Sequence, residues 1–240
     1  MPDKYQYDQY INIRKAFLNP EYRGMETSDP ELKYDDFSKN MIAQKYILIK
    51  CKYPASFRRP EQRGKHLFVV LARVDSEFHN RSKELIYLLD KLSTVPEAKS
   101  NESIDLILIS KELLKKRTIK KMKEYDQFRC TNILSVRFSI ELPKANLCSR
   151  HEIVPIEEIK KLAEECYIQI DRLSYLSEDD AQNIWIGGLP GEVVKITRPS
   201  LMAGIAITYR YITGIIARPA EHGDGGDEDE GDEVDEKADE

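Results

Sequence analysis

The spacing of apolar residues along the chain predicts four amphipathic helices in its first half. Over residues 10–19 and 80–92, apolar side chains recur three and four positions apart, which is the repeat of one face of an α-helix. Residues 27–41 and 111–125 show the same repeat, and lysines cover the polar face of the latter segment. Each helix is expected to bury its apolar face against a neighbouring layer.

Between these helices lie runs of β-branched and aromatic residues that predict buried strands. They cover residues 45–53, 65–74 and 103–110, and residues 131–140 are expected to form a further strand pair. Strands that alternate with helices in this order form a mixed sheet with flanking helices and at least one parallel crossover. We therefore expect an α/β domain over residues 1–142.

A second set of elements begins after a change in composition. Residues 143–147 hold Pro, Lys and Asn in place of periodic apolar residues, which predicts a linker. A helical repeat over residues 156–168 and a strand-rich stretch over residues 192–211 follow. They predict a small α+β domain over residues 148–213. Its sheet core is expected to come from the branched residues Val193, Val194, Ile196, Ile205 and Ile207.

Charge is divided unevenly along the chain. The net charge is −5, but residues 221–240 contain twelve Asp or Glu and one Lys, so residues 1–220 carry about +6. A block of like charge with so few apolar residues cannot bury enough surface to fold. We therefore expect residues 214–240 to form a disordered acidic tail. Such a tail either solubilises the protein or competes for a basic surface.

Apolar segments and cysteines limit where the protein works. No apolar run approaches the roughly 18–20 residues that a membrane span needs. The charged N-terminus lacks the apolar segment of a secretory signal. The four cysteines lie far apart, as is usual for free thiols in a reducing compartment. We expect an intracellular protein that is not secreted and has no membrane partner.

The sequence gives little support for chemistry of its own. No Ser or Cys stands in a nucleophile-elbow pattern, and residues 187–192 lack the Lys-Ser/Thr of a phosphate-binding loop. Cys148 and His151 form one pair of zinc ligands, where a structural site needs two. Asp75 and Glu77 follow a strand and leave a metal-dependent nuclease as an alternative. We expect no metal and no cofactor.

The lysine-rich helix predicts that the protein binds a polyanion. Ser110 stands at its predicted start, and Lys111, Lys115 and Lys116 follow in its first turns. Unpaired N–H groups at a helix N-terminus and nearby lysines attract a phosphate backbone without sequence preference. These four residues are the candidates for a position near DNA. The alternative is a solvated helix face.

The stretch from residue 151 onward matches a known pattern. The matching positions are His151, Val154, Pro155, Asp180, Gly187, Gly191, Val193, Val194, Lys195, Ile196, Arg198, Ser200, Ala203, Gly204, Tyr209 and Arg210. With these residues in register, the stretch resembles the C-terminal domain of the fifth subunit shared by eukaryotic nuclear RNA polymerases. Archaeal RNA polymerases have a counterpart of that domain. The order of the earlier elements extends the resemblance over residues 1–213.

The resemblance implies a non-catalytic subunit of a multisubunit DNA-directed RNA polymerase. Its C-terminal domain would dock on the largest subunit, among other polymerase subunits. The N-terminal jaw-like domain, which the archaeal counterpart lacks, would lie beside downstream DNA. This places the protein in the nucleus, or in a viral factory or virion. The residues expected to bind a partner are His151, Pro155, Lys195, Arg198, Pro199, Ser200, Ala203, Gly204, Tyr209 and Arg210.

The chain also departs from the family pattern. Ala181 stands where the family has Pro, Ile184 where it has Arg, and Met202 where it has Thr. Residues 54–64 and 141–150, like the acidic tail, look like additions. Such divergence suggests a distant member, of the kind that a large DNA virus with its own polymerase encodes.

Two other classes of function stay open at this point. One is the metal-dependent nuclease built on Asp75 and Glu77. The other is a free-standing nucleic-acid-binding adaptor in which the acidic tail is autoinhibitory.

Overall fold

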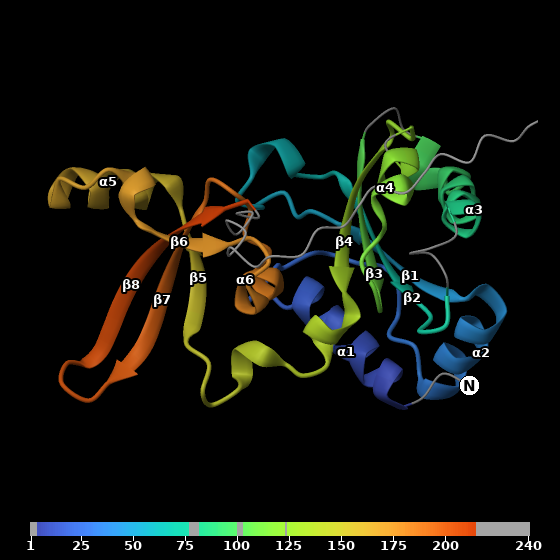
Figure 1. Cartoon of the computed structure of the whole chain (residues 1–240), viewed down its shortest axis with the longest axis horizontal. Helices are drawn as coiled ribbons and strands as arrows, with labels where there is room; N and C mark the ends of the chain where they lie inside the picture. The colour runs from blue at the N-terminus through green and yellow to red at the C-terminus, as the bar shows by residue number, and fades with distance from the viewer. Residues whose placement is uncertain (1–3, 77–81, 100–102, 123, 215–240) are drawn as a thin grey trace, which may run out of the picture.

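In a computed structural model that describes residues 4–76, 82–99, 103–122 and 124–214, the chain forms two four-stranded sheets. The sheets occupy opposite halves of the long axis of the molecule, each with its own helices (Figure 1). The predicted mixed α/β architecture is confirmed. The expected acidic tail lies outside the described residues, apart from Gly214.

The first sheet has the strand order β1-β2-β3-β4. β1 runs antiparallel to β2, whereas β2, β3 and β4 are parallel, so the predicted parallel crossover is confirmed. The helices and strands of this half are α1 (Lys4–Leu18), α2 (Tyr34–Gln44), β1 (Tyr46–Lys52), β2 (His66–Ala72), α3 (Ser82–Ser93), β3 (Ile104–Ser110), α4 (Lys116–Met122) and β4 (Phe128–Leu134).

Both faces of the sheet are buried at its central strands, which explains why β2 and β3 are apolar almost without interruption. Ile49 of β1 and Val69 of β2 pack in one buried cluster with Phe17 of α1. Val70, one position further along β2, packs in a second cluster with Leu88 of α3. Side chains therefore alternate between a face covered by α1 and α2 and a face covered by α3 and α4.

The strand pair predicted for residues 131–140 is wrong. β4 ends at Leu134 and a 3₁₀ turn, η3 (Ser135–Phe138), follows it. Gln9 of α1 donates from Nε2 to the Ser135 carbonyl at 3.0 Å, and Asn12 of α1 donates from Nδ2 to the Phe138 carbonyl at 3.0 Å. Side chains of α1 thus pair carbonyl groups that a second strand would have bonded, and the aromatic ring of Phe138 turns into the core.

The helix predicted over residues 111–125 is shorter in the structure, because α4 covers only Lys116–Met122. On β4, the Asn132 side chain accepts the N–H of Leu114 at 2.9 Å and holds the preceding loop against the end of the sheet. Ser110 therefore does not start a helix, contrary to prediction.

The second sheet has the order β5-β7-β8-β6. β5 and β8 both run antiparallel to β7, and β6 runs parallel to β8. Val194, Ile196 and Ile212 form its small core on one face. The elements of this half are β5 (Arg150–Val154), α5 (Ile156–Cys166), β6 (Ser174–Ser177), α6 (Ala181–Ile186), β7 (Val193–Ser200) and β8 (Gly204–Thr213).

Trp185 of α6 joins the two halves, because it is fully buried in the core of the first one. Its ring lies 5.7 Å from the ring of Phe138, and its Nε1–H donates to the carbonyl of Arg137 at 3.0 Å. Next to it, the buried guanidinium of Arg23 donates to the carbonyl of Ile184. Burial lowers the pKa of Arg23 to about 9.

Two arginines from the segment that looks like an addition, residues 54–64, hold the loop after α6. Arg59 donates to both carboxylate oxygens of Glu192, at 2.9 and 2.7 Å, and Arg58 Nε lies 3.3 Å from the same carboxylate. Both also donate to the carbonyl of Gly187, at 2.6 Å from Arg58 and 2.8 Å from Arg59. We call this contact the arginine clamp. It fixes the residues that lead directly into β7.

The clamp also determines the ionisation of its members. Burial alone would raise the pKa of Glu192, but hydrogen bonds from Arg59 and the charges of Arg58 and Arg59 outweigh burial. The pKa of Glu192 therefore lies below its usual range. Burial also lowers the pKa of Arg58.

We predict that Trp185→Ala lowers the free energy of unfolding by about 3–5 kcal/mol, because it leaves a cavity between the two halves. Urea unfolding of the full chain measures this. Trp185→Phe is the control: it keeps an aromatic ring and loses one hydrogen bond, which costs about 1 kcal/mol. Equal losses of unfolding free energy in the two variants would contradict a role of the indole ring in holding the two halves together.

We further predict that Glu192→Gln lowers stability at pH 7 by about 1.5–3 kcal/mol, the usual contribution of hydrogen bonds to a charged group. A carboxylate whose pKa is lower in the folded state stabilises the folded protein at pH values above its ordinary pKa of 4.5. This stabilisation is lost as the pH falls through the folded-state pKa. The difference in unfolding free energy between the original chain and Glu192→Gln should therefore become smaller below pH 4.5. Thermal unfolding across pH measures it, with the exposed carboxylate change Glu157→Gln as the control. If this difference in stability did not change with pH, Glu192 would not be ionised in the arginine clamp.

Candidate functional site

The hairpin of β7 and β8 is longer than the strands that flank it. β5 pairs with β7 only over residues 193–197, and β6 pairs with β8 only over residues 210–213. The hairpin strands pair with each other as far as Ser200 and Gly204. Its distal part is therefore a two-stranded ribbon, which extends away from the rest of the molecule in Figure 1. We call residues 198–207 the hairpin tip.

Large apolar side chains gather on the hairpin tip without cover from the described residues. Leu201 and Met202 are fully exposed, and Ile205 and Ile207 are 63% and 52% exposed. Ile205 pairs with Pro199 across the ladder, and alternation along β8 places it on the same face as Ile207. Apolar groups of this size in one place mark a surface that is usually covered by a partner.

The core role predicted for Ile205 and Ile207 is thus wrong, whereas Val193, Val194 and Ile196 are buried as predicted. Neighbouring elements cover only the base of the hairpin. There, Ile159 of α5 packs in a cluster with Val193. An alternating pattern identifies the faces of a strand but not how far the adjacent strands and helices extend.

The turn at the tip depends on Ser200 and Gly204. The N–H of Ala203 donates to Ser200 Oγ at 3.3 Å. Gly204 has a φ of 69°, in the left-handed region where a side chain costs about 1–2 kcal/mol. A Cβ atom at Gly204 would meet no described atom within 4 Å, so the backbone conformation requires glycine there and crowding does not.

Five of the ten predicted partner-binding residues come together on the hairpin tip. Arg198, Pro199, Ser200, Ala203 and Gly204 are all exposed or half-buried there. Lys195 and Tyr209 oppose each other nearer the base, on the face that carries the exposed isoleucines. Arg210 is exposed on the opposite face.

The other two predicted residues lie away from the tip, on and after β5. His151 pairs with Ile196 of β7, and its Nδ1 lies 2.9 Å from the carbonyl of Ser149. Pro155 is exposed where α5 begins. The sequence did not identify the exposed Ile205 and Ile207 as site residues. A branched residue in a strand has the same pattern whether it lies in the core or on a binding surface.

A second surface surrounds α4 and the loop before it. We call it the α4 basic surface, formed by the exposed side chains of Lys111, Lys115, Lys116, Arg117 and Lys120. None of these five makes an ion pair with another residue in the part of the chain that the structure describes. Of the predicted DNA-proximal residues, Ser110 is buried, and its hydroxyl accepts a hydrogen bond from Asn132 at 2.9 Å. Ser110 therefore supports the loop from inside.

The groups proposed for a nuclease do not assemble among the described residues. Asp75 is exposed and paired with the guanidinium of Arg73, whose hydrogen bonds hold the pKa of Asp75 below its usual range. Glu77 lies outside the described residues.

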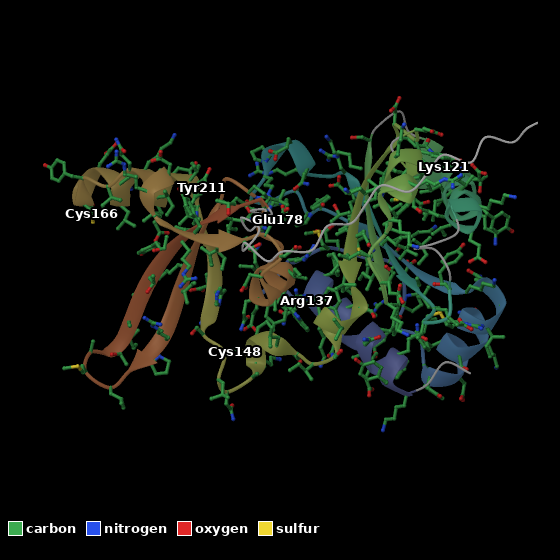
Figure 2. All side chains as sticks on the ribbon, in the orientation of Figure 1. Lys121, Arg137, Cys148, Cys166, Glu178 and Tyr211 are labelled. Carbon is green, nitrogen blue, oxygen red and sulfur yellow. The ribbon has the colours of Figure 1, made fainter. Side chains whose placement is uncertain are left out.

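The predicted zinc ligands Cys148 and His151 are not joined by Cys166, the cysteine of α5. Cys148 and Cys166 lie far apart in Figure 2, before β5 and at the end of α5. Within the described ranges, no group of three or more His, Cys, Asp or Glu side chains could hold a metal ion. No helix in those ranges is long and apolar enough to cross a membrane.

Comparison with known proteins identifies the half of the molecule that carries the hairpin. Residues 140–212 match the family model of the RNA polymerase Rpb5 C-terminal domain. The match therefore includes β5 to β8, the arginine-clamped loop and the hairpin tip.

Curated relatives come from viruses and archaea. The DNA-directed RNA polymerase RPB5 homolog of an African swine fever virus warthog isolate is 26% identical over 199 residues, 80% of this chain and 91% of the relative. The homolog of a tick isolate is 31% identical over 125 residues, 50% of this chain and 61% of the relative. The RNA polymerase subunit Rpo5 of Sulfolobus acidocaldarius is 36% identical over 78 residues, 32% of this chain and 93% of the relative.

These comparisons confirm the predicted resemblance. The relatives are named as a subunit or as RPB5 homologs of DNA-directed RNA polymerase. The chain belongs to the RNA polymerase Rpb5 family.

Proposed function

We propose that this chain is a non-catalytic subunit of a multisubunit DNA-directed RNA polymerase, attached to the largest subunit by the hairpin tip. The α/β half then acts as a jaw beside downstream DNA. The observation that carries the proposal is the exposed apolar group Leu201, Met202, Ile205 and Ile207 on the half of the chain that matches the family. A protein with this role works where its polymerase does, in a nucleus or a viral factory.

The composition of the hairpin tip suits a protein partner. Burying a branched apolar side chain contributes about 1.5–3 kcal/mol, and arginine and tyrosine often anchor interfaces. The exposed isoleucines supply the apolar centre, while Arg198 and Tyr209 supply hydrogen bonds at its edge. Gly204 itself has no side chain that would keep a partner backbone at a distance.

The arginine clamp connects the hairpin to the first sheet, so docking of the hairpin affects the position of that sheet. Glu192 immediately precedes β7, and Arg58 and Arg59 belong to the loop between β1 and β2. A partner that holds the hairpin would therefore also set the position of the first sheet. This coupling supports a jaw whose location is determined by the C-terminal half.

We predict that the double variant Ile205→Ser, Ile207→Ser binds the largest polymerase subunit about 100-fold more weakly or worse, because two branched side chains lose their burial. Co-expression of the two subunits followed by affinity purification measures the loss. The variant should remain folded, since both side chains are exposed in the isolated chain.

The matched control changes two apolar residues exposed elsewhere, Ile42→Ser with Val136→Ser, which are 51% and 59% exposed. This control should retain full binding. If the hairpin variant co-purified as well as the control, the docking surface would have to lie elsewhere.

The α4 basic surface supports the second part of the proposal. Lys111, Lys115 and Lys116 are exposed and lack ion-pair partners among the described residues. Each lysine that neutralises a phosphate releases a counterion, so binding through this surface falls steeply with salt and does not read sequence. α4 begins at Lys116 and Ser110 does not start it, so we assign the attraction to the exposed lysine and arginine side chains.

We predict that Lys115→Glu with Lys116→Glu lowers the salt resistance of transcribing complexes assembled with the variant. The slope of log affinity against log salt should decrease by about 2 if both lysines contact phosphates. Lys160→Glu with Lys161→Glu on α5 imposes the same charge change and is the control. Equal salt resistance in the two double variants would remove the role of α4 near DNA.

A further inference from the structure

The α4 basic surface is the densest run of cationic residues in the chain. Five exposed Lys or Arg stand against one carboxylate over residues 111–120. Some other cations of the molecule have carboxylate partners, such as Lys15 with Glu141, at 2.9 Å, and Lys50 with Glu97, at 3.2 Å. A surface with this much uncompensated charge attracts any nearby polyanion, including one on the same chain.

The chain itself contains such a polyanion. Residues 221–240 hold twelve carboxylates and a single lysine. No other segment of comparable length in the sequence has so strong a charge of either sign. The charges of the two segments are complementary.

The end of the described chain lies where this segment can reach α4. The carbonyl of Thr213 accepts the N–H of Glu178 at 3.0 Å, and Figure 2 places Glu178 near the middle of the molecule, between the hairpin and Lys121. Twenty-six residues follow Gly214. A flexible chain of that length has a root-mean-square span of about 25–30 Å.

We propose that the acidic residues 221–240 bind the α4 basic surface of their own chain and compete there with nucleic acid. The contact joins exposed lysine and arginine side chains to carboxylates, so it is reversible and weakens as salt screens the charges. A duplex with enough phosphates displaces the tail, whereas isolated anions do not. The contact stands whether or not the chain serves a polymerase, and its effect on DNA binding deepens the proposed role of α4.

Carbodiimide cross-linking of the dilute full chain tests the contact directly, because this reagent joins only amines and carboxylates that touch. At about 50 mM salt, where the Debye length exceeds 10 Å, we expect links from residues 221–240 to Lys115, Lys116 and Lys120. At about 500 mM salt these links should disappear. Links that are absent, or that involve Lys160 and Lys161 equally often, would overturn the proposal.

Fluorescence anisotropy with a 20-base-pair duplex tests the competition. Changing Asp or Glu to Asn or Gln at residues 227–230, 232 and 233 should tighten binding at low salt by roughly threefold to tenfold, because a few surface ion pairs no longer compete. In the Lys115→Glu, Lys116→Glu background the same tail changes should have no effect.

The two measurements separate the possible failures. Cross-links to α4 without any change in duplex affinity would overturn the competition and also argue against DNA at α4. A gain in affinity that persists in the Lys115→Glu, Lys116→Glu background would show that the tail acts through general charge repulsion, which would overturn the assigned surface.

Discussion

The geometry of the whole molecule depends on the contact of Glu192 with Arg58 and Arg59. The three charges come from opposite halves of the chain and are largely removed from water, so their attraction is stronger than that of a surface pair. If one partner were lost, the other charges would stay partly buried without compensation. Beside them, Trp185 fills a position in the core of the first half. Together these contacts turn two small sheets into one body at the point where β7 begins.

Because the base of the β7–β8 hairpin is fixed, the hairpin can form part of the sheet and still present its tip for binding. Near the clamp, Val193 and Val194 meet α5 on one face and the small core on the other, so they are buried. Beyond residues 197 and 210 the flanking strands stop, and the same alternation places Ile205 and Ile207 in solvent. An isolated two-stranded ribbon is only marginally stable in water. A partner that covers its apolar face would therefore stabilise the ribbon as well as bind it.

Local patterns predicted most of the fold, and long-range contacts account for the errors. The leucines of α3 and the apolar runs of the first sheet revealed their elements because each repeat is short and both faces are buried. The turn at Ser135 could not be predicted, since it depends on amide side chains more than a hundred residues earlier. The arginine clamp was equally invisible, because no sequence pattern links Arg59 to Glu192. Of the candidate site, the tip residues were found by resemblance, while the exposure of Ile205 depends on where other strands end.

Two segments that look like additions to the family pattern both work through charge, but burial separates their consequences. Residues 54–64 bring arginines to a carboxylate in a partly buried contact, where hydrogen-bond geometry is fixed and salt screens the charges less. In the contact proposed for residues 221–240, carboxylates meet lysines that remain exposed to water, where each pair contributes little and exchanges readily. The same kind of interaction can therefore lock one part of a molecule and leave another open to competition.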